Sequence, residues 1–211
     1  MRVDAKRTRA AILNAARQVL CSTSIDAMTM QAIIDESGVS KAQVYRHYRT
    51  PNVVIVDLAA GIVEAIKEEI MAHPEEAAAT PAAAYARAAV TVLTSDPDPN
   101  RQIILYGSVQ SKDGKWVPSA GLATNGNAPE ALFKKWGVEL PEVNVALTYF
   151  RGAMYSWACG FFTDEQFAAE TERSVTMKEP AAKKKPAAKK KPAAKKKPAA
   201  KKKPAAKRSE G

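Results

Sequence analysis

Residues 26–48 read DAMTMQAIIDESGVSKAQVYRHY, and this stretch decides the fold of the N-terminal part of the chain. Thr29 is suited to cap a helix, and Gly38 is suited to end it because glycine tolerates left-handed backbone angles. Ser40 and Gln43 have the spacing of a capping box, in which a hydroxyl and an amide satisfy each other's backbone donors where the next helix begins. The stretch therefore predicts a helix-turn-helix, whose second helix is the one that enters the major groove of DNA.

A helix that precedes this motif supplies the apolar surface on which it packs. From residue 8 to residue 20, apolar residues recur at helical spacing, with polar residues on the other side. We expect the three helices to share one small core, formed by Ile12, Ala16, Leu20, Ala32, Ile33, Val44 and Tyr48. The first domain then covers residues 1–50.

The chain between residues 51 and 179 also has the pattern of helices, since no stretch alternates over strand length. Thr163 and Gln166 have the spacing of a second capping box. We expect helices over residues 51–72, 81–94, 100–110, 127–136, 141–160 and 163–177, with a long loop over 111–127. The predicted fold class is all-α, with a helical bundle over residues 51–179 as the second domain.

Residues 180–211 are a lysine-rich repeat with a period of six residues. The sequence Ala-Ala-Lys-Lys-Lys stands between prolines at positions 180, 186, 192, 198 and 204. Proline removes a backbone donor and pushes the preceding residue out of the helical region, so we predict a disordered tail. The net charge of +10 divides into +4 for residues 1–50, −7 for 51–179 and +13 for 180–211. The two basic ends favour a nucleic acid as the partner.

Several function classes find no support in the sequence. It has no glycine-rich nucleotide loop, no nucleophile elbow and no Cys/His spacing for zinc, so we expect neither an enzyme nor a metal or cofactor. Cys21 and Cys159 stand in apolar helical contexts and are predicted to be buried, reduced thiols. No apolar run approaches the roughly 18 to 20 residues of a membrane span. The basic start lacks the apolar stretch of a secretory signal, so we expect a soluble, cytoplasmic protein.

Over about residues 8–60 the sequence resembles the TetR/AcrR family of transcriptional regulators. Four segments carry the resemblance: Thr8 to Ala16, Asp26 to Met30, Glu36 to Lys41, and Val44 to Tyr48. It implies a homodimeric DNA-binding repressor that reads a palindromic operator and is released by a small effector bound in the second domain. The downstream region is similar to the family in architecture only, and the lysine tail is not part of the family pattern.

The resemblance also assigns roles to individual residues. Those at positions that meet bases are Gln31, Lys41, Ala42 and Gln43, and their chemistry suits guanine, adenine and the thymine methyl. Those at phosphate-contact positions are Thr29, Ser40, Tyr45 and His47. Two departures from the family stand out. Pro51 stands where the family commonly has a lysine that contacts a phosphate, and Arg49 is placed to supply that contact instead. Ser24 stands where the family commonly has a glycine.

Each of these assignments has an ordinary alternative. Tyr45 and His47 also suit packing beneath the short helix, and Lys41 suits a solvated charge. A set of basic residues is assigned to non-specific DNA binding, as an N-terminal arm and as the tail: Arg2, Lys6, Arg7, Lys183, Lys184, Lys185, Lys189, Lys190 and Lys191. Arg9 belongs to the same arm, although these N-terminal residues also suit a solubilising terminus.

In the second domain the helix expected over 141–160 has two faces. An apolar seam recurs at spacings of four and three, formed by Val143, Leu147, Phe150, Met154, Trp157 and Phe161, and a small-residue face is formed by Gly152, Ser156 and Gly160. We expect one face to make the dimer contact and the other to line the interior. An apolar or aromatic effector site is assigned to Tyr106, Trp116, Phe133, Trp136, Phe150 and Trp157.

Two other accounts of the chain remain open. The tail resembles the Lys/Pro/Ala-rich tails of linker-histone-like bacterial proteins, so the protein could instead compact DNA in the bacterial nucleoid. The regular repeat is also compatible with an extension that has no role. The repressor and the DNA-compacting protein both have double-stranded DNA as their partner, and an extension without a role has no partner. No membrane is expected in any of these cases.

Overall fold

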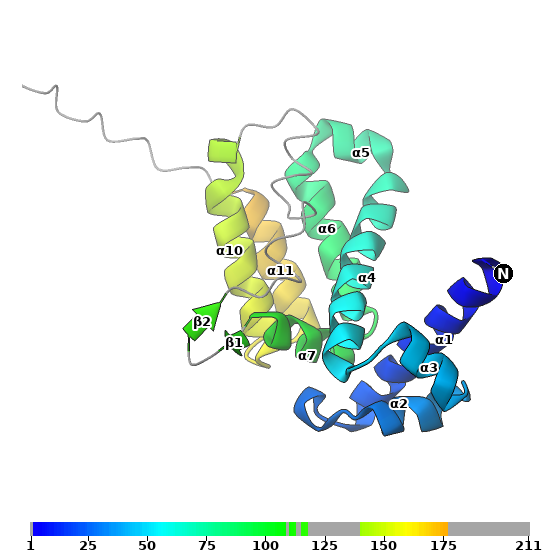
Figure 1. Ribbon diagram of the computed structural model, residues 1–211. Helices are drawn as coiled ribbons and strands as arrows, with labels where there is room; N and C mark the ends of the chain where they lie inside the picture. Colours follow the sequence, from blue (N-terminus) through cyan, green and yellow to red (C-terminus); the bar gives the residue numbers. More distant parts are fainter. Residues whose placement is uncertain (1, 109, 113–114, 118–139, 177–211) are drawn as a thin grey trace, which may run out of the picture. The chain divides into compact units, whose positions relative to one another are not determined.

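The computed structural model describes residues 2–108, 110–112, 115–117 and 140–176 (Figure 1). The elements in chain order are α1 (Arg2–Ser22), the 3-10 turn η1 (Ile25–Ala27), α2 (Met30–Ser37), α3 (Lys41–His47), α4 (Pro51–Met71), α5 (Pro74–Ala79), α6 (Pro81–Thr94), α7 (Pro97–Ser108), β1 (Gln110–Lys112), β2 (Lys115–Val117), α10 (Leu140–Ala158) and α11 (Asp164–Val175). The predicted all-α class is confirmed, and a short hairpin is the exception to it in the described part. The predicted helix over 127–136 and the tail over 180–211 lie outside the described residues.

Helices α1, α2 and α3 form the N-terminal unit, with α2 lying against α1 (Figure 1). Its core is the predicted one, because side chains on all three helices are fully or almost fully buried: Ile12, Ala16, Leu20, Ile33, Val44 and Tyr48. Ala32 is partly buried against the same cluster. The apolar spacing of the sequence therefore fixed how the three helices pack.

Helices α4, α6, α7, α10 and α11 form a bundle in which α11 packs against both α10 and α6 (Figure 1). Helix α4 begins at Pro51 and turns one apolar face inward over its whole length: Val54, Ile55, Leu58, Ala59, Ile62, Ile66 and Ile70. The bundle and the N-terminal unit share one continuous cluster of buried residues, which runs from Ile12 to Phe167. The domain boundary at residue 50 stays a prediction.

Three predicted stretches differ in local structure. Helix α1 begins at Arg2 rather than near residue 8, so the basic residues expected as an arm form its first turns. No helix was predicted between residues 72 and 81, yet Pro74 is the first residue of the short helix α5, for which proline's fixed φ is suited. Part of the expected loop is an antiparallel hairpin that pairs Gln110 with Val117. Strands of three residues are too short to leave a period in the sequence.

The helix caps confirm two predictions and correct one. The Thr29 hydroxyl accepts a hydrogen bond from the Ala32 amide, and Thr163 forms the full capping box with Gln166. Ser40 makes no side-chain bond to the backbone, so the capping box predicted there is wrong. Its hydroxyl donates to the Gln43 side chain instead.

The prediction of buried thiols is also wrong, since Cys21 and Cys159 are both exposed and unpaired with each other. Cys21 lies in the last turn of α1, next to the buried Leu20, on the side of the helix that faces away from the core. Cys159 follows the last residue of α10. Cys21 differs from its buried neighbour Leu20 because consecutive helical residues are about 100° apart, whereas Cys159 is exposed in the turn after the buried Ala158.

Candidate nucleic-acid interface

The turn between α2 and α3 is held by its own backbone and a serine. Gly38 has φ 61° and ψ 8°, a left-handed conformation in which a side chain would be strained. The Ser37 hydroxyl accepts a hydrogen bond from the Val39 amide at 3.2 Å. Ser24, which stands where the family commonly has glycine, lies at φ −68° and ψ 150°, so the bend after α1 is open to any residue.

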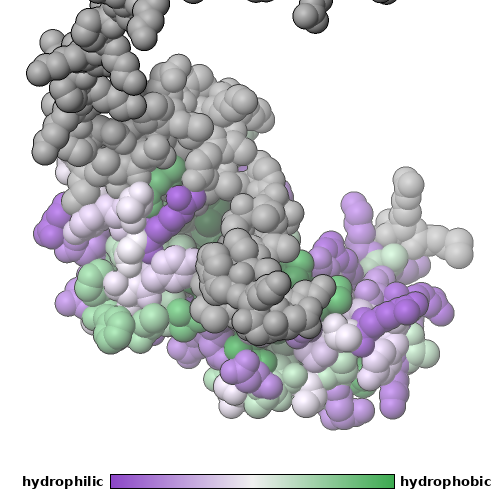
Figure 2. All heavy atoms as spheres, turned by 60° about the vertical axis from the view of Figure 1, so that its left-hand side comes forward, coloured by the Kyte–Doolittle hydropathy of each residue, from purple (hydrophilic) through white to green (hydrophobic). Residues whose placement is uncertain are grey.

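The residues predicted to contact bases and phosphates lie on the outer side of α2, α3 and their flanking turns. Nearly all of them are exposed: Thr29, Gln31, Ser40, Lys41, Ala42, Gln43, Tyr45 and Arg49. Figure 2 shows hydrophilic residues gathered around the N-terminal helices, on the right of the view. The structure thus leaves these side chains accessible together, as a surface that binds DNA requires.

His47 and Arg46 add detail to this surface of α3. His47 is half-buried, and its ring lies 6.3 Å from the ring of Tyr48, which fits packing beneath the helix. Arg46 was not predicted as a contact, yet it is exposed in the last turn of α3. Its position three residues after Gln43 was a usable signal, because residues three apart lie on neighbouring parts of a helix surface. No acidic residue occurs within α3.

The two glutamines of this surface are each tied to a neighbour. The Ser40 hydroxyl donates to Gln43 Oε1 at 3.0 Å. In α2, Gln31 Nε2 donates to Asp35 Oδ1 at 2.7 Å, one helical turn away. Each amide therefore has one hydrogen-bond partner within its own helix or the turn before it.

A three-residue cluster joins α1, the end of α3 and α4. Asp57 Oδ2 accepts hydrogen bonds from the Tyr48 hydroxyl at 2.6 Å and from the Arg9 guanidinium at 2.8 Å, and Arg9 Nε also donates to the Tyr48 oxygen at 3.1 Å. Tyr48 is 2% exposed, so its hydroxyl has replaced water with these partners. We call Arg9, Tyr48 and Asp57 the clasp, and it orients α3 on α1 and α4.

The clasp keeps the Tyr48 hydroxyl protonated. Burial, followed by the hydrogen bond to the Asp57 carboxylate, raises the pKa of Tyr48 to about 12 against the opposing effect of Arg9, since a phenolate could not donate to that oxygen. The same carboxylate and the tyrosine raise the pKa of Arg9. Arg9 is exposed like its neighbours Lys6 and Arg7, but its guanidinium already has partners within the protein.

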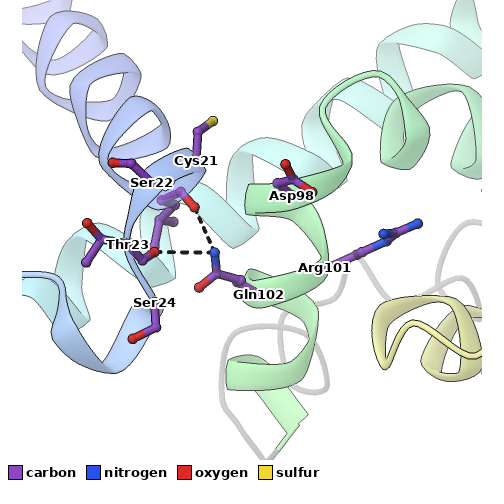
Figure 3. A pocket seen from close by; sticks show the side chains of 8 residues that line it. Cys21, Ser22, Thr23, Ser24, Asp98, Arg101 and Gln102 are labelled. Carbon is purple, nitrogen blue, oxygen red and sulfur yellow. Dashed lines mark hydrogen bonds between the residues drawn. The ribbon is translucent and has the colours of Figure 1, made fainter.

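One glutamine of α7 fastens the N-terminal unit to the bundle. Gln102 Nε2 donates to the carbonyl oxygens of Leu20 at 2.7 Å and Thr23 at 3.4 Å, and its Oε1 accepts from the Ile25 amide at 2.7 Å. These backbone groups lie at the end of α1 and in the turn to η1, where a regular helix does not supply their hydrogen-bond partners. The side chain of Gln102 reaches this turn from α7 in Figure 3.

A second link lies one turn of helix away. Arg17 in α1 donates to the Asn100 side-chain oxygen at 2.9 Å and pairs with Asp96 at 3.4 Å. Asn100 is 2% exposed, and its amide nitrogen donates to the carbonyl oxygens of Val92 and Leu93, both at 3.1 Å. Asn100 thus connects α1 through α7 to the end of α6.

An open groove of about 430 Å³ lies at this junction, lined by Leu20, Cys21, Ser22, Thr23, Ser24, Asp98, Arg101 and Gln102 (Figure 3). Arg101 points away from the α1–η1 turn in the same view. It instead pairs with Asp164 at 2.8 Å and lies 4.8 Å from the centre of the Trp157 ring. The groove lies where the N-terminal unit contacts the bundle.

Of the residues predicted to bind an effector, Phe150 and Trp157 belong to the buried core cluster and Tyr106 packs against it. Phe150 and Trp157 are 4% and 0% exposed and both pack on the Phe167 ring, at 6.2 Å and 5.2 Å. Tyr106 is half-buried, and its hydroxyl donates to Asn52 Oδ1 in the first turn of α4 at 2.8 Å. Only the backbone of Trp116 is described, in β2, and the predicted Phe133 and Trp136 fall outside the described residues.

The two faces of α10 are separated as expected. Leu147, Phe150 and Trp157 of the apolar seam are buried, Met154 is partly buried, and Phe161 departs from the seam because it is 79% exposed just after the helix. The small-residue face, by contrast, is turned outward. Gly152 and Gly160 are exposed there, and Ser156 is half-buried.

Gly160 has a structural role that the spacing did not reveal. Its φ of 80° is left-handed, and it ends α10 with a pair of backbone bonds, from the Gly160 amide to the Trp157 carbonyl and from the Phe161 amide to the Ser156 carbonyl. The glycine is therefore required by the helix terminus whether or not another chain lies against it.

Within the described ranges, no group of three or more His, Cys, Asp or Glu side chains is placed to hold a metal ion. Among the same residues, no helix has both the length and the apolar character that a membrane span needs.

Residues 12–50 match the family model described as "Bacterial regulatory proteins, tetR family". The match begins in α1 and ends just before α4, so it covers the helix-turn-helix and the helix on which it packs. No curated protein and no solved structure matches the chain in the corresponding comparisons. The helix-turn-helix of this chain is therefore similar to that of bacterial regulatory proteins of the tetR family, and this similarity supports a DNA-binding regulator of transcription.

Proposed function

We propose that this protein is a sequence-specific DNA-binding repressor that a small effector releases from its operator. The observation that carries the proposal is the exposed row of polar and basic side chains on a helix-turn-helix that matches the tetR family model. Lys41 and Gln43 stand in the first turn of α3 and read base edges. Tyr45, Arg46 and Arg49 contact phosphates, which position the helix without choosing a sequence.

The contacts between α1 and α7 support regulation by the bundle. Gln102 and Asn100 bind α1 and its following turn directly, so a shift of α7 has to move the N-terminal unit or break these bonds. An effector that alters the position of α7 therefore changes the presentation of α3. The groove beside Gln102 is where the N-terminal unit meets the bundle.

We propose that the protein acts as a dimer through the outer face of α10 together with α11. Gly152 is exposed, and an added Cβ there would meet nothing within 4 Å in the protomer. Sedimentation of the full chain and of residues 1–179 should therefore give dimers at micromolar concentration. Gly152→Ala should weaken the dimer without lowering the free energy of unfolding of the protomer, and a monomeric wild type would contradict the proposal.

The tail supplies affinity for DNA without sequence choice. Its 13 lysines and one arginine against one glutamate make a polycation, and each phosphate it neutralises should steepen the salt dependence of binding by about 0.9 in a plot of log affinity against log salt. Removal of residues 180–211 should flatten that slope by several units. An unchanged slope would leave the tail without a DNA role.

The strength of this tail favours a second candidate function, that of an architectural protein which compacts DNA. The experiment that separates the two is a genome-wide binding selection with the full chain and with residues 1–179. A repressor gives a short list of preferred sites that both proteins protect from cleavage. An architectural protein gives no preferred site once the tail is removed.

A further inference from the structure

Helix α11 carries the chain away from the helix-turn-helix. It begins at Asp164, whose carboxylate pairs at 2.8 Å with Arg101 of α7, the helix that also binds the α1–η1 turn through Gln102. Figure 1 shows α11 running from there toward the end of the bundle where α4 ends and α5 lies. Thr176, which follows α11 and is the last described residue, is therefore at the end of the bundle away from α2 and α3.

The lysine-rich tail accordingly starts far from the surface that is proposed to read DNA. Helix α11 has 12 residues, and at 1.5 Å per residue it is about 18 Å long. Beyond its first residue come α7, then α1, then the helix-turn-helix, and the axes of packed helices lie about 8–10 Å apart. The path from the end of α11 to the outer surface of α2 and α3 is therefore about 40 Å.

This distance limits what the tail can contribute to the duplex that α3 binds. As a flexible coil, the chain after Thr176 has a root-mean-square extent of about 30–35 Å and does not span the path. In the extended form, at about 3.1 Å per residue, it spans the path only by laying about 13 residues beside the bundle. The lysines up to Lys189 then serve as a spacer, whereas a second duplex at the far end is within reach of all 13 tail lysines.

The charge of the protein changes sign twice along the same direction. Residues 1–50 carry +4, residues 51–179 carry −7, and residues 180–211 carry +13. Because DNA is a polyanion, it is attracted to the two basic parts and repelled from the sides of the bundle. This distribution favours one duplex at each end of the bundle over a single duplex that touches both basic parts.

We propose that this protein bridges two DNA duplexes, with α2 and α3 on the selected site and residues 180–211 on a second duplex of any sequence at the other end of the bundle. The inference rests on the proposed function, because it requires that the helix-turn-helix holds one duplex. It assigns the tail a partner of its own, a second segment of double-stranded DNA rather than the flanks of the operator. One molecule then joins a regulated site to a distant segment of DNA.

The test measures whether operator-bound protein captures a second duplex. The full chain is loaded on beads that carry the selected site, free protein is washed away, and a labelled duplex of scrambled sequence is titrated in. The wild type should bind the labelled duplex. A twofold rise in salt should lower its affinity for that duplex by at least about tenfold, as the loss of counterion release at four phosphates would.

Two full-length variants separate the charge of the tail from its position. In the first, glutamine replaces all 13 tail lysines, and this chain should still occupy the selected site but bind the labelled duplex at least about tenfold more weakly. In the second, residues 180–211 are moved ahead of Met1, so the same charge extends from α1 in the N-terminal unit. Because the tail then lies beside the selected site, the affinity for that site should rise and the affinity for the labelled duplex should fall by at least about fivefold.

Three results would overturn the bridging. A wild type that occupies the selected site and captures no labelled duplex would show that the tail does not hold a second duplex. Equal capture by the glutamine variant would place the second duplex on another surface, and equal capture by the relocated tail would show that its place after α11 does not matter. A wild type that binds beads with the selected site and beads with scrambled DNA equally would refute the proposed function, and this inference with it.

Discussion

Replacing Tyr48 with phenylalanine tests whether the clasp holds the helix-turn-helix on α4. The substitution keeps the ring in a site that is 2% exposed and removes only the oxygen that donates to Asp57 at 2.6 Å. A hydrogen bond to a charged partner contributes about 1.5–3 kcal/mol, so Tyr48→Phe should lower the free energy of unfolding by that amount. For a unit of this size the melting temperature should fall by about 3–12 °C.

Arg9→Ala is the comparison that makes this prediction sharp. The Arg9 side chain is 52% exposed, so its ion pair with Asp57 at 2.8 Å is screened by water and contributes at most about 1 kcal/mol. Arg7→Ala is the matched control, because Arg7 is exposed and has no ion pair among the described residues. The free energies come from urea unfolding of the full chain at pH 7. A loss for Arg9→Ala equal to that for Tyr48→Phe would refute the reasoning.

Gln102→Ala should lower the free energy of unfolding by about 1–3 kcal/mol because the Ile25 amide and its neighbouring carbonyls lose their partner, whereas Gln18→Ala on exposed α1 surface should change it little in the same urea assay. Gly160→Ala should cost about 1–2 kcal/mol by calorimetry, since its φ of 80° strains any side chain; no cost would mean that the turn relaxes freely. The pKa of Tyr48 is raised above that of tyrosine in the unfolded chain, so its contribution to the free energy of unfolding should be fully present below pH 10 and lost between pH 10 and 12. Urea unfolding across this pH range should therefore show a smaller fall in stability for Tyr48→Phe than for the wild type.

The N-terminal unit was predictable because local rules and packing agree there. The Thr29 cap, the left-handed Gly38 and the apolar spacing from Ile12 to Tyr48 all specify the same three helices, and the structure contains them. The clasp was not predictable, since Arg9 and Asp57 are 48 residues apart and no local pattern links them.

Other features depended on tertiary contacts that leave no local signal. Gln102 looks like any polar residue of an amphipathic helix until the α1–η1 turn is placed against α7. Cys21 and Cys159 were predicted to be buried from their neighbours in sequence, although burial depends on the side of the helix on which a residue lies. The spacing of Ser40 and Gln43 correctly predicted that the two residues interact. The predicted bonds were to backbone amides, whereas the observed bond joins the two side chains.

The central claim is that the surface of α2 and α3 reads DNA sequence, and the affinity of Lys41→Ala for two DNA duplexes tests it most directly. One duplex is the site that the wild type selects, and the other is a scrambled sequence of the same length, both measured with residues 1–179 and the full chain. The account predicts a loss of about 1–3 kcal/mol on the selected site, which is about 5- to 150-fold in affinity, with less than twofold change on the scrambled one. Equal losses on both duplexes, or a wild type that does not distinguish them, would contradict it.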